Sequence, residues 1–352
     1  MALPFLGNRT RTRSQIIAVD LGTHTFKAVH IQQKGGKLCL TDYSIEDSPG
    51  RNGPVTTQSL GDALNKVIQP LGGRSKQVAL ALGAGETILR HAELPLVAPG
   101  DMRTMLKYNA KNYLQQDLSD HVFDCYVVPP RRGAKLELKP GQKCRVLVGG
   151  APARLINDIL ASAKIAGVIP EVVVPGLVGP VNAFESAQPE PFAEKAVALV
   201  DIGFQSSSIT ILLKGELMLT RVVGIGGDRL TSGVAEALGI GYAEAEGIKM
   251  GLPQEVETTL VAQLSPLVRE LRASIDYFEH QQDCSVSEVF VSGGTSSSDY
   301  VLQFVQTELA VPCVTWNPAT FLTLNLPARK LSDMEQAAPR LTTAIGAALA
   351  AL

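Results

Sequence analysis

The stretch Ile17-Ala18-Val19-Asp20-Leu21-Gly22 recurs in the second half of the chain as Ala198-Leu199-Val200-Asp201-Ile202-Gly203. In both copies an apolar run of strand type ends in an Asp, and a Gly follows two residues later. Each copy precedes a polar loop and then a predicted antiparallel hairpin. About half of the 352-residue chain separates the two copies. A repeat of this length predicts two similar domains that face each other across a cleft, with both loops at the cleft.

The composition indicates a globular chain with enough apolar residues for sizeable cores. Hydrophobic residues make up 45% of the sequence and charged residues 19%, and the length exceeds the roughly 100–200 residues of one ordinary domain. The formal net charge of -2 gives the chain no strong positive potential that would attract nucleic acid, so we expect no nucleic-acid partner. Arg9, Arg11 and Arg13 form a local basic cluster. Such a cluster is typical of a solvated terminal arm, and a weak contact with a membrane surface is the alternative.

The cysteines and the apolar runs predict a cytoplasmic protein. The five cysteines form no CxxC pair and are odd in number, which favours free thiols in a reducing compartment. Residues 1–8 are too short and too poorly patterned for a signal peptide. No apolar run reaches the ~18–20 residues of a membrane-spanning helix, and the Ala-rich run 342–352 is predicted to be a buried helix. Any membrane contact is therefore expected to go through partner proteins.

The order of the predicted elements indicates layered α/β domains. The first half has predicted strands at 16–19, 26–31, 37–43 and 78–82 and a helix at 59–70. Between about 86 and 170 the patterns predict a separate module, with helices at 102–115 and 153–166, strands at 121–128 and 144–149, and a polar loop at 131–143. The second half has predicted strands at 196–200, 207–213, 216–223, 289–292 and near 314. Its predicted helices are at about 227–238, 242–249, 256–282, 298–310 and the C-terminus.

The residues around the two Asp-x-Gly turns have the chemistry of a phosphate and metal site. Glycine lets the backbone turn tightly and lets a phosphate approach main-chain N–H groups. Hydroxyl, amide and ammonium groups nearby can bind phosphate oxygens, and the candidates are Gly22, Thr23, His24, Thr25, Lys27, Gly203, Gln205, Ser206 and Ser207. The carboxylates of Asp20 and Asp201 would repel phosphate. They could instead hold a hydrated Mg²⁺, which prefers oxygen ligands and keeps several waters.

Two later glycine loops and a charged pair extend this candidate site. The loops precede predicted helices, where glycines suit anions or the close packing of a nucleoside, and comprise Gly226, Gly227, Asp228, Gly293, Gly294 and Thr295. Glu246 and Lys249 share one helix face and could grip a ribose and a base edge. Each feature alone is common: a lone Gly-Gly is usually a turn, and an i, i+3 pair is more often a surface ion pair. The order of all five features at element junctions indicates a nucleotide site.

This order of motifs resembles the actin/Hsp70/hexokinase superfamily, and within it the PilM/FtsA branch. The resemblance covers about residues 15–350 and is most specific in the second half, at 200–203, 220–221, 226–231, 244–249 and 271–278. It implies an actin-like (ribonuclease H-like, duplicated) two-domain α/β fold with an inserted 1C-type subdomain. The implied organisation is a flexible arm at 1–14, the first part of subdomain 1A at 15–85, the 1C insert at 86–170, a hinge and return segment at 171–200, a second domain (2A/2B) at 201–340 and a C-terminal helix at 341–352 packed on the first domain.

The same resemblance implies ligands and partners. Members of this branch bind ATP and Mg²⁺, here through water on Asp20 and Asp201. They receive the N-terminal cytoplasmic tail of PilN, an inner-membrane protein paired with PilO. We therefore expect an adaptor of type IV pilus assembly, peripheral to the bacterial inner membrane. The tail should lie as an extended peptide between 1C and the neighbouring subdomain. Self-association is left open.

Two departures from the family pattern affect the expected chemistry. His24 stands where relatives usually have a small hydroxyl residue, and its imidazole could either crowd the γ-phosphate or donate to it. The stretch 172–177 has Val, Pro and Gly where relatives often have an acidic residue. No candidate base is therefore seen for the attacking water, and no catalytic residue is assigned. We predict an ATPase that is at most weak, with the nucleotide in a structural or regulatory role.

Three alternatives remain at this point. A small-molecule kinase of the same superfamily would need a catalytic Asp in the first domain, and no convincing one is found. An FtsA-like membrane-associated filament protein would need an amphipathic C-terminal helix, but residues 344–352 lack basic side chains. A protein of this fold could also have lost nucleotide binding altogether.

Overall fold

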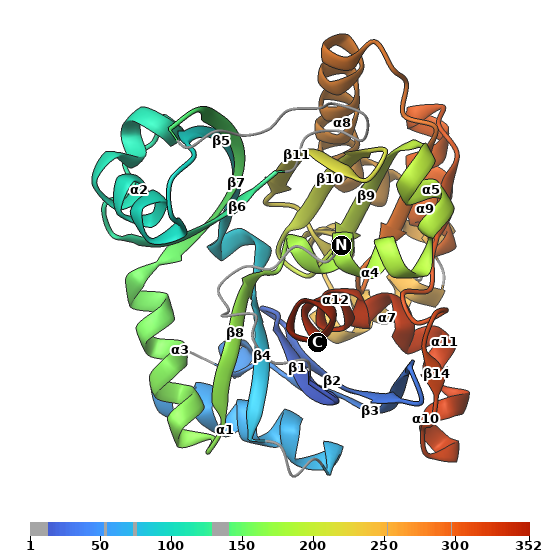
Figure 1. Cartoon of the computed structure of the whole chain (residues 1–352). Coiled ribbons are helices and arrows are strands. Elements are labelled where there is room, and N and C mark those ends of the chain that lie inside the picture. Colours follow the sequence, from blue (N-terminus) through green and yellow to red (C-terminus); the bar gives the residue numbers. More distant parts are fainter. Residues whose placement is uncertain (1–12, 53–54, 73–75, 129–140, 252, 297) are drawn as a thin grey trace.

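The computed structural model describes residues 13–52, 55–72, 76–128, 141–251, 253–296 and 298–352. Two α/β halves lie next to each other, and a smaller sheet stands beside them (Figure 1). Arg9, Arg11 and most of the loop predicted at 131–143 lie outside the described residues. Arg13 is described, and it forms an ion pair with Glu171 and a hydrogen bond to Gln77.

The first half is built on a six-stranded sheet in the order β14-β3-β2-β1-β4-β8. Its strands are β1 (Gln15–Leu21), β2 (Thr25–Lys34), β3 (Lys37–Asp47), β4 (Gln77–Leu82), β8 (Ile169–Pro175) and β14 (Thr323–Leu324). Strands β1, β2 and β3 form an antiparallel meander, and β4 and β8 run parallel to β1. The strands predicted in this half are confirmed.

The second half repeats this topology in a five-stranded sheet, β11-β10-β9-β12-β13. Its strands are β9 (Ala196–Ile202), β10 (Ser207–Leu213), β11 (Glu216–Val223), β12 (Glu288–Ser292) and β13 (Cys313–Thr315). Again an antiparallel hairpin flanks the central strand on one side, and two parallel strands follow on the other. Because β9 occupies the place of β1, the internal repeat is confirmed as a duplicated, actin-like architecture.

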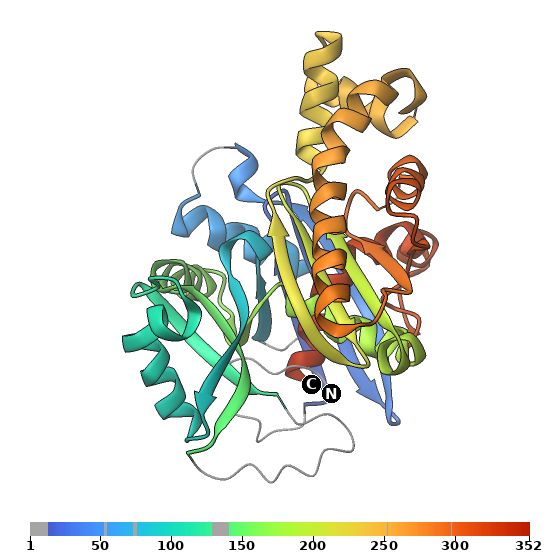
Figure 2. The same cartoon turned by 90° about the horizontal axis from the view of Figure 1, so that it is seen from above.

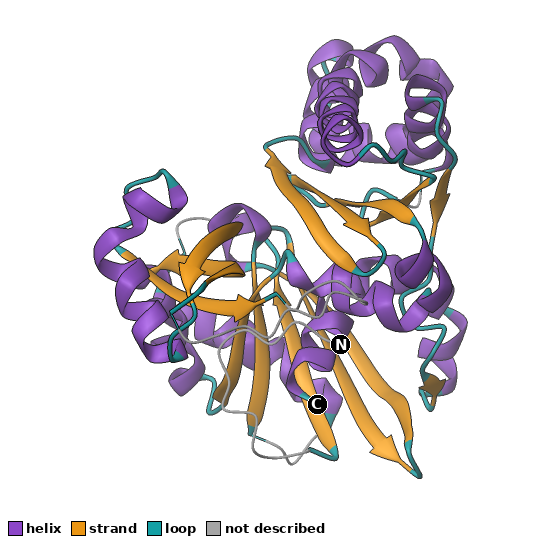
Figure 3. Cartoon of the chain, turned by 45° about the horizontal axis from the view of Figure 1, so that its top comes forward, coloured by secondary structure: helices purple, strands orange, loops and turns teal. Residues whose placement is uncertain are grey.

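Helices cover the faces of both sheets and also lie between them (Figure 3). On the outer face of the first sheet, α1 (Thr57–Ile68) packs with α3 (Ala153–Ile165). The second sheet is covered by α6 (Gly227–Leu238), α7 (Tyr242–Gly251), α8 (Glu257–Gln282) and α9 (Asp299–Leu309). Between the sheets, α4 (Val178–Ala187) packs on α12 (Thr342–Ala351), and α5 (Pro189–Glu194) leads into β9. The C-terminal helix is buried as predicted and contacts β1 and β4.

A three-stranded antiparallel sheet, β5-β7-β6, forms the small unit beside the two halves (Figure 2). It consists of β5 (Ile88–Pro95), β6 (His121–Val127) and β7 (Lys143–Pro152), and α2 (Pro99–Leu114) packs its apolar side chains on it. The sequence patterns assigned no element to β5. Helix α3 lies in the predicted insert but packs mainly on α1, within the core of the first half. The outer limits of the insert therefore stay a prediction.

The small sheet touches the hairpin of the second half through polar contacts. The Thr220 hydroxyl donates to the Leu89 carbonyl at 2.8 Å, and the His91 Nε2 lies 2.7 Å from the Leu217 carbonyl. Burial lowers the pKa of His91, so its ring stays neutral near pH 7. These contacts tie β5 to β11, and the small sheet is thus held against both halves.

The last part of the chain returns from the second half to the first. It carries β14, α10 (Ala328–Ser332) and α11 (Met334–Ala337), and a 3-10 helix at Ala338–Leu341 leads into α12. Lys330 donates to Asp42 on β3 at 2.6 Å, which anchors this return. Within the described ranges, no helix has the length and apolarity needed to cross a membrane.

Candidate functional site

A cavity of about 1000 Å³ lies between the two halves and receives both Asp-x-Gly turns. Most predicted site residues line it: Asp20, Gly22, Thr23, His24, Thr25, Lys27, Asp201, Gly203, Gln205, Ser206, Gly227, Glu246, Lys249, Gly294 and Thr295. The volume is at the upper end of the usual range for small-molecule sites. The duplicated turns therefore meet in one cavity, as the repeat predicted.

The first carboxylate, Asp20, is held by the neighbouring strand. Asp20 and Lys27 are directly opposite each other in the β1–β2 register, and the Lys27 Nζ lies 2.9 Å from the Asp20 Oδ2. Both side chains are mostly buried. The ammonium group therefore compensates the negative charge of Asp20, and it lies within the cavity lining.

The second carboxylate, Asp201, is electrostatically coupled to the first. The Ser292 hydroxyl on β12 donates to the Asp201 Oδ2 at 2.9 Å. Burial raises the pKa of Asp201 to about 6, and the nearby charge of Asp20 acts in the same direction. Burial and the charge of Asp20 destabilise the ionised form of this carboxylate. A bound cation would balance the negative charge and stabilise that form. The donor set at this point therefore fits a hydrated Mg²⁺.

A metal centre made by the protein alone is not part of this arrangement. Among the described residues, no group of three or more His, Cys, Asp or Glu side chains is placed to hold a metal ion. Mg²⁺ usually takes one or two carboxylates and completes its shell with water and substrate phosphates. Asp20 and Asp201 fit that pattern.

Glycines let the loops around the cavity approach closely. A Cβ on Gly227 would lie 2.7 Å from the Thr295 Oγ1, and a Cβ on Gly22 would lie 2.6 Å from the Lys27 Nζ. Gly293 has a φ of +95°, which side chains rarely adopt, and a Cβ there would meet the Ile202 nitrogen at 2.8 Å. The loop after β12 can therefore pack against the end of β9 and the start of α6 only because Gly293 and Gly227 carry no side chain.

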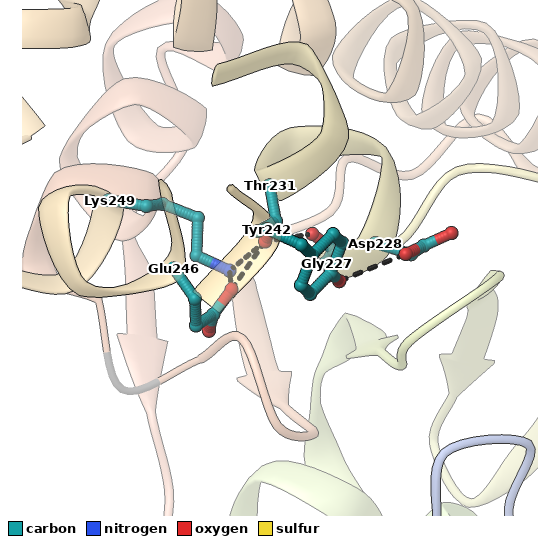
Figure 4. Close-up of polar contacts among 6 residues, drawn as sticks. All are labelled: Gly227, Asp228, Thr231, Tyr242, Glu246 and Lys249. Carbon is teal, nitrogen blue, oxygen red and sulfur yellow. Dashed lines mark hydrogen bonds and ion pairs between the residues drawn. The ribbon is translucent and has the colours of Figure 1, made fainter. Parts of the chain in front are cut away.

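Helices α6 and α7 supply a polar network on one wall of the cavity (Figure 4). The buried Lys249 ammonium donates to the Glu246 Oε2 at 2.6 Å and to the Thr231 Oγ1 at 2.9 Å. The Thr231 hydroxyl also contacts Glu246 and lies 3.0 Å from the Gly227 carbonyl. Burial raises the pKa of Glu246, but the hydrogen bonds from Lys249 and Thr231 outweigh it and leave the pKa lowered. Glu246 is thus an ionised acceptor at the cavity wall.

Four predicted residues lie beside the cavity lining instead of in it. Ser207 is the first residue of β10, is fully buried and donates to the Ile225 carbonyl at 2.6 Å. Asp228 accepts a hydrogen bond of 2.9 Å from the Tyr242 hydroxyl. Gly226 and Gly293 pack their backbones against neighbouring loops. Strand alternation explains Ser207, because its neighbours Ser206 and Ser208 both line the cavity.

Several lining residues were not predicted from sequence, namely Glu86, Phe204, Tyr242, Gln336, Arg340 and Thr343. Phe204 lies inside the second Asp-x-Gly loop, so its position there could have been noticed. Glu86 comes from a short 3-10 helix after β4, and burial raises its pKa. Burial also lowers the pKa of Arg340, just before α12. Nothing local in the sequence marks these last two positions.

An aromatic contact lies in the lining of the cavity. The rings of His24 and Phe204 are stacked, with centroids 4.0 Å apart and an angle of 17° between their planes. His24 follows β1 and Phe204 follows β9, so the stack joins the two halves. His24, expected either to crowd the γ-phosphate or to donate to it, is therefore accompanied by a ring from the opposite loop.

Comparison with known proteins identifies the family. A family model described as type IV pilus assembly protein PilM matches residues 18–352. The chain belongs to this family. Its structure is similar to that of the PilM-PilN type IV pilus biogenesis complex, with a TM-score of 0.80, 20% identity, and coverage of 95% of this chain and 97% of that chain. The structure of MreB5 of Spiroplasma citri bound to AMPPNP is similar at a TM-score of 0.50 and 11% identity, over 87% of this PilM-family chain and 92% of that one. These structural likenesses show the fold.

A curated relative agrees with the predicted branch. The cell division protein FtsA of Streptococcus pneumoniae serotype 2 (strain D39 / NCTC 7466) is 19% identical over 317 residues, which is 83% of this chain. The PilM-family chain spans 66% of the length of that relative. The family assignment rests on the family model, and the actin-like fold rests on the structural likeness to the PilM-PilN complex.

Proposed function

We propose that this PilM-family protein is a nucleotide-binding adaptor of type IV pilus assembly, which binds ATP with Mg²⁺ and the N-terminal cytoplasmic tail of a PilN-like inner-membrane protein. The observation that carries the nucleotide part is the single cavity of about 1000 Å³ lined by both Asp-x-Gly turns. Its residues provide donors for phosphate, a carboxylate pair for a hydrated cation and a polar wall for the nucleoside. The MreB5 structure with AMPPNP shows that a protein of similar fold holds such a nucleotide.

Each part of the cavity has a proposed role. Thr23, Gln205 and Ser206, with the glycine backbones beside them, would hold phosphate oxygens. Asp20 and Asp201 would hold Mg²⁺ through water. Glu246 and Lys249 would contact the ribose and the base edge, next to the adenosine loop formed by Gly293, Gly294 and Thr295. A bound Mg²⁺ would neutralise phosphate charge, while the chain's own groups position the nucleotide.

Titration calorimetry with ATP tests this assignment, with and without Mg²⁺. We expect binding that Mg²⁺ strengthens, and we expect Asp201→Asn to remove that strengthening. Asp283→Asn is a matched control, since Asp283 ends α8 and lies outside the cavity lining. Absence of ATP binding to the wild-type chain would refute the nucleotide part of the proposal.

Slow ATP turnover is part of the same proposal. Strand β8 ends at Pro175, and Gly176, which follows it, lines the cavity, so this edge offers no side-chain base to the attacking water. We expect the nucleotide to act structurally or as a regulator. Turnover at several per second by the purified protein would contradict this.

The partner's tail is proposed to bind beside the small sheet. A second hollow, of about 350 Å³, lies between α2, β6 and the start of α3, and Arg103, Lys107 and His121 are among its lining residues. It therefore lies where the small sheet meets the first half, which suits a short extended peptide. The proposed link of the protein to the inner membrane, and its indirect link to a PilO-like protein, both depend on this tail.

Fluorescence anisotropy with a labelled peptide of a PilN-like tail tests the partner, in the presence and absence of Mg-ATP. Lys107→Glu reverses a charge in the hollow and should weaken binding. Lys111→Glu makes the same change one turn further along α2, outside the hollow, and should not. Equal affinities of the two variants would place the tail elsewhere on the surface.

A further inference from the structure

The stack of His24 on Phe204 lies between the two loops that would hold the phosphates. The ring centroids are 4.0 Å apart, which is close to ring-on-ring contact, and the two rings come from opposite halves of the molecule. Both residues line the main cavity. The rings therefore occupy space between the loop after β1 and the loop after β9.

The backbones that carry the rings are fixed in place. The Ser48 N–H donates to the His24 carbonyl at 2.9 Å, and the Asp228 N–H donates to the Phe204 carbonyl at 2.9 Å. A Cβ on Gly226 would lie 2.6 Å from the Phe204 carbonyl carbon, so no room is left behind that loop. A ligand between the loops can therefore displace the rings only by rotating them apart or by separating the two halves.

We propose that the His24–Phe204 stack is a specificity element that makes this cavity favour a nucleoside diphosphate over a triphosphate. This inference rests on the proposed nucleotide function and adds a preference to it. A chain of phosphates that contacts both loops competes with the rings for the same space, and the competition grows with each added phosphate. Stacked aromatic pairs contribute about 0.5–1.5 kcal/mol, so breaking this one weakens triphosphate binding by about 2- to 12-fold.

The alternative role of His24 is to donate a hydrogen bond to the terminal phosphate, and two substitutions separate the roles. His24→Thr removes the ring and leaves a small hydroxyl. His24→Phe keeps an aromatic ring for the stack but removes both ring nitrogens. If the stack restricts the site, the two variants differ in triphosphate binding, whereas a donating imidazole is lost equally in both.

The experiment is calorimetric titration of ADP and ATP, each with Mg²⁺, into the full chain and its variants. We expect the wild-type protein to bind ADP at least about twofold more tightly than ATP. His24→Thr and Phe204→Ala should each shift the ADP/ATP affinity ratio toward ATP by about 2- to 12-fold. His24→Phe should keep the wild-type ratio. His121→Thr is the matched control, because His121 also stacks on a phenylalanine, Phe123, but outside the main cavity.

The outcomes are distinguishable. An affinity ratio that is the same in the wild-type protein, His24→Thr and Phe204→Ala overturns the inference while leaving the nucleotide site intact. Equal and selective loss of ATP binding in His24→Thr and His24→Phe also overturns it, since this shows donation by the imidazole. Failure of the wild-type protein and of both ring-removing variants to bind either nucleotide refutes the proposed function itself, and the inference with it. Thermal unfolding of each variant verifies that it is folded.

Discussion

Replacing Gly346 by Ala tests the contact on which the placement of the two halves depends. Gly346 lies in the middle of α12, and it faces Gly179 on α4, the helix that leads from the first sheet toward the second. A Cβ on Gly346 would lie 2.5 Å from the carbonyl carbon of Gly179, 2.7 Å from its Cα and closer still to its oxygen. These are backbone atoms, so no side-chain rotation can make room. The two helices would have to move apart.

The expected cost follows from this geometry. Overpacking a core typically lowers the free energy of unfolding by 1–3 kcal/mol, and we expect a clash with rigid backbone to cost about 3 kcal/mol. Ala has a higher helix propensity than Gly and stabilises the helix by about 1 kcal/mol. The expected net loss in free energy of unfolding is therefore about 2 kcal/mol. Unfolding entropy of about 2.1 cal/mol/K per residue over 352 residues makes this a fall in Tm of about 3 °C.

A matched control makes the same substitution in open space. Gly247 lies inside α7, and a Cβ there would meet nothing within 4 Å. Gly247→Ala should therefore raise Tm by about 1 °C through helix propensity alone. Differential scanning calorimetry measures both variants. A Gly346→Ala protein as stable as the wild type would show that α4 and α12 do not pack as described.

Three further predictions concern the cavity. Because Asp201 has a pKa raised to about 6, its proton competes with Mg²⁺ below that pH, so calorimetry should show Mg²⁺-dependent nucleotide affinity falling by up to about tenfold per pH unit below 6 and staying flat above 7. Lys249→Met removes the ammonium that holds Glu246 and Thr231, and it should destabilise the protein in urea by about 1.5–3 kcal/mol and weaken nucleotide binding; an unchanged unfolding midpoint would count against this network. Glu86→Gln should leave the slow ATP turnover unchanged in a phosphate-release assay, and a large loss would identify Glu86 as a base that the sequence did not reveal.

Much of the secondary structure of the second half was predictable, because its signals are local. The strands predicted at 207–213 and 216–223 and the helix at 227–238 coincide with β10, β11 and α6. Glycines at the hairpin turn and at the end of α6 adopt positive φ, so the residue type that ends these elements can be recognised in the sequence. Strand β5 was missed because Arg90, His91 and Glu93 interrupt its apolar residues, so that it has neither an apolar run nor a regular alternation.

Which side chains share the cavity was less predictable. The repeated Asp-x-Gly turns placed Asp20 and Asp201 together, since equivalent strands of a duplicated fold end at equivalent edges. The sequence does not predict in the same way that Phe204 faces His24. This contact depends on how far apart the two loops are held, and that distance is set by helices packed between the sheets.

The sequence by itself determined the duplicated α/β architecture, the Asp-x-Gly turns and the burial of the C-terminal helix, because apolar periodicity and glycine spacing act over a few residues. Only the tertiary structure decided that Arg340 and Thr343 join a cavity wall formed by residues far from them in the chain. The physical reason is that such positions depend on the packing of α4 against α12. Many small contacts between distant segments set that packing, and no single local pattern records them.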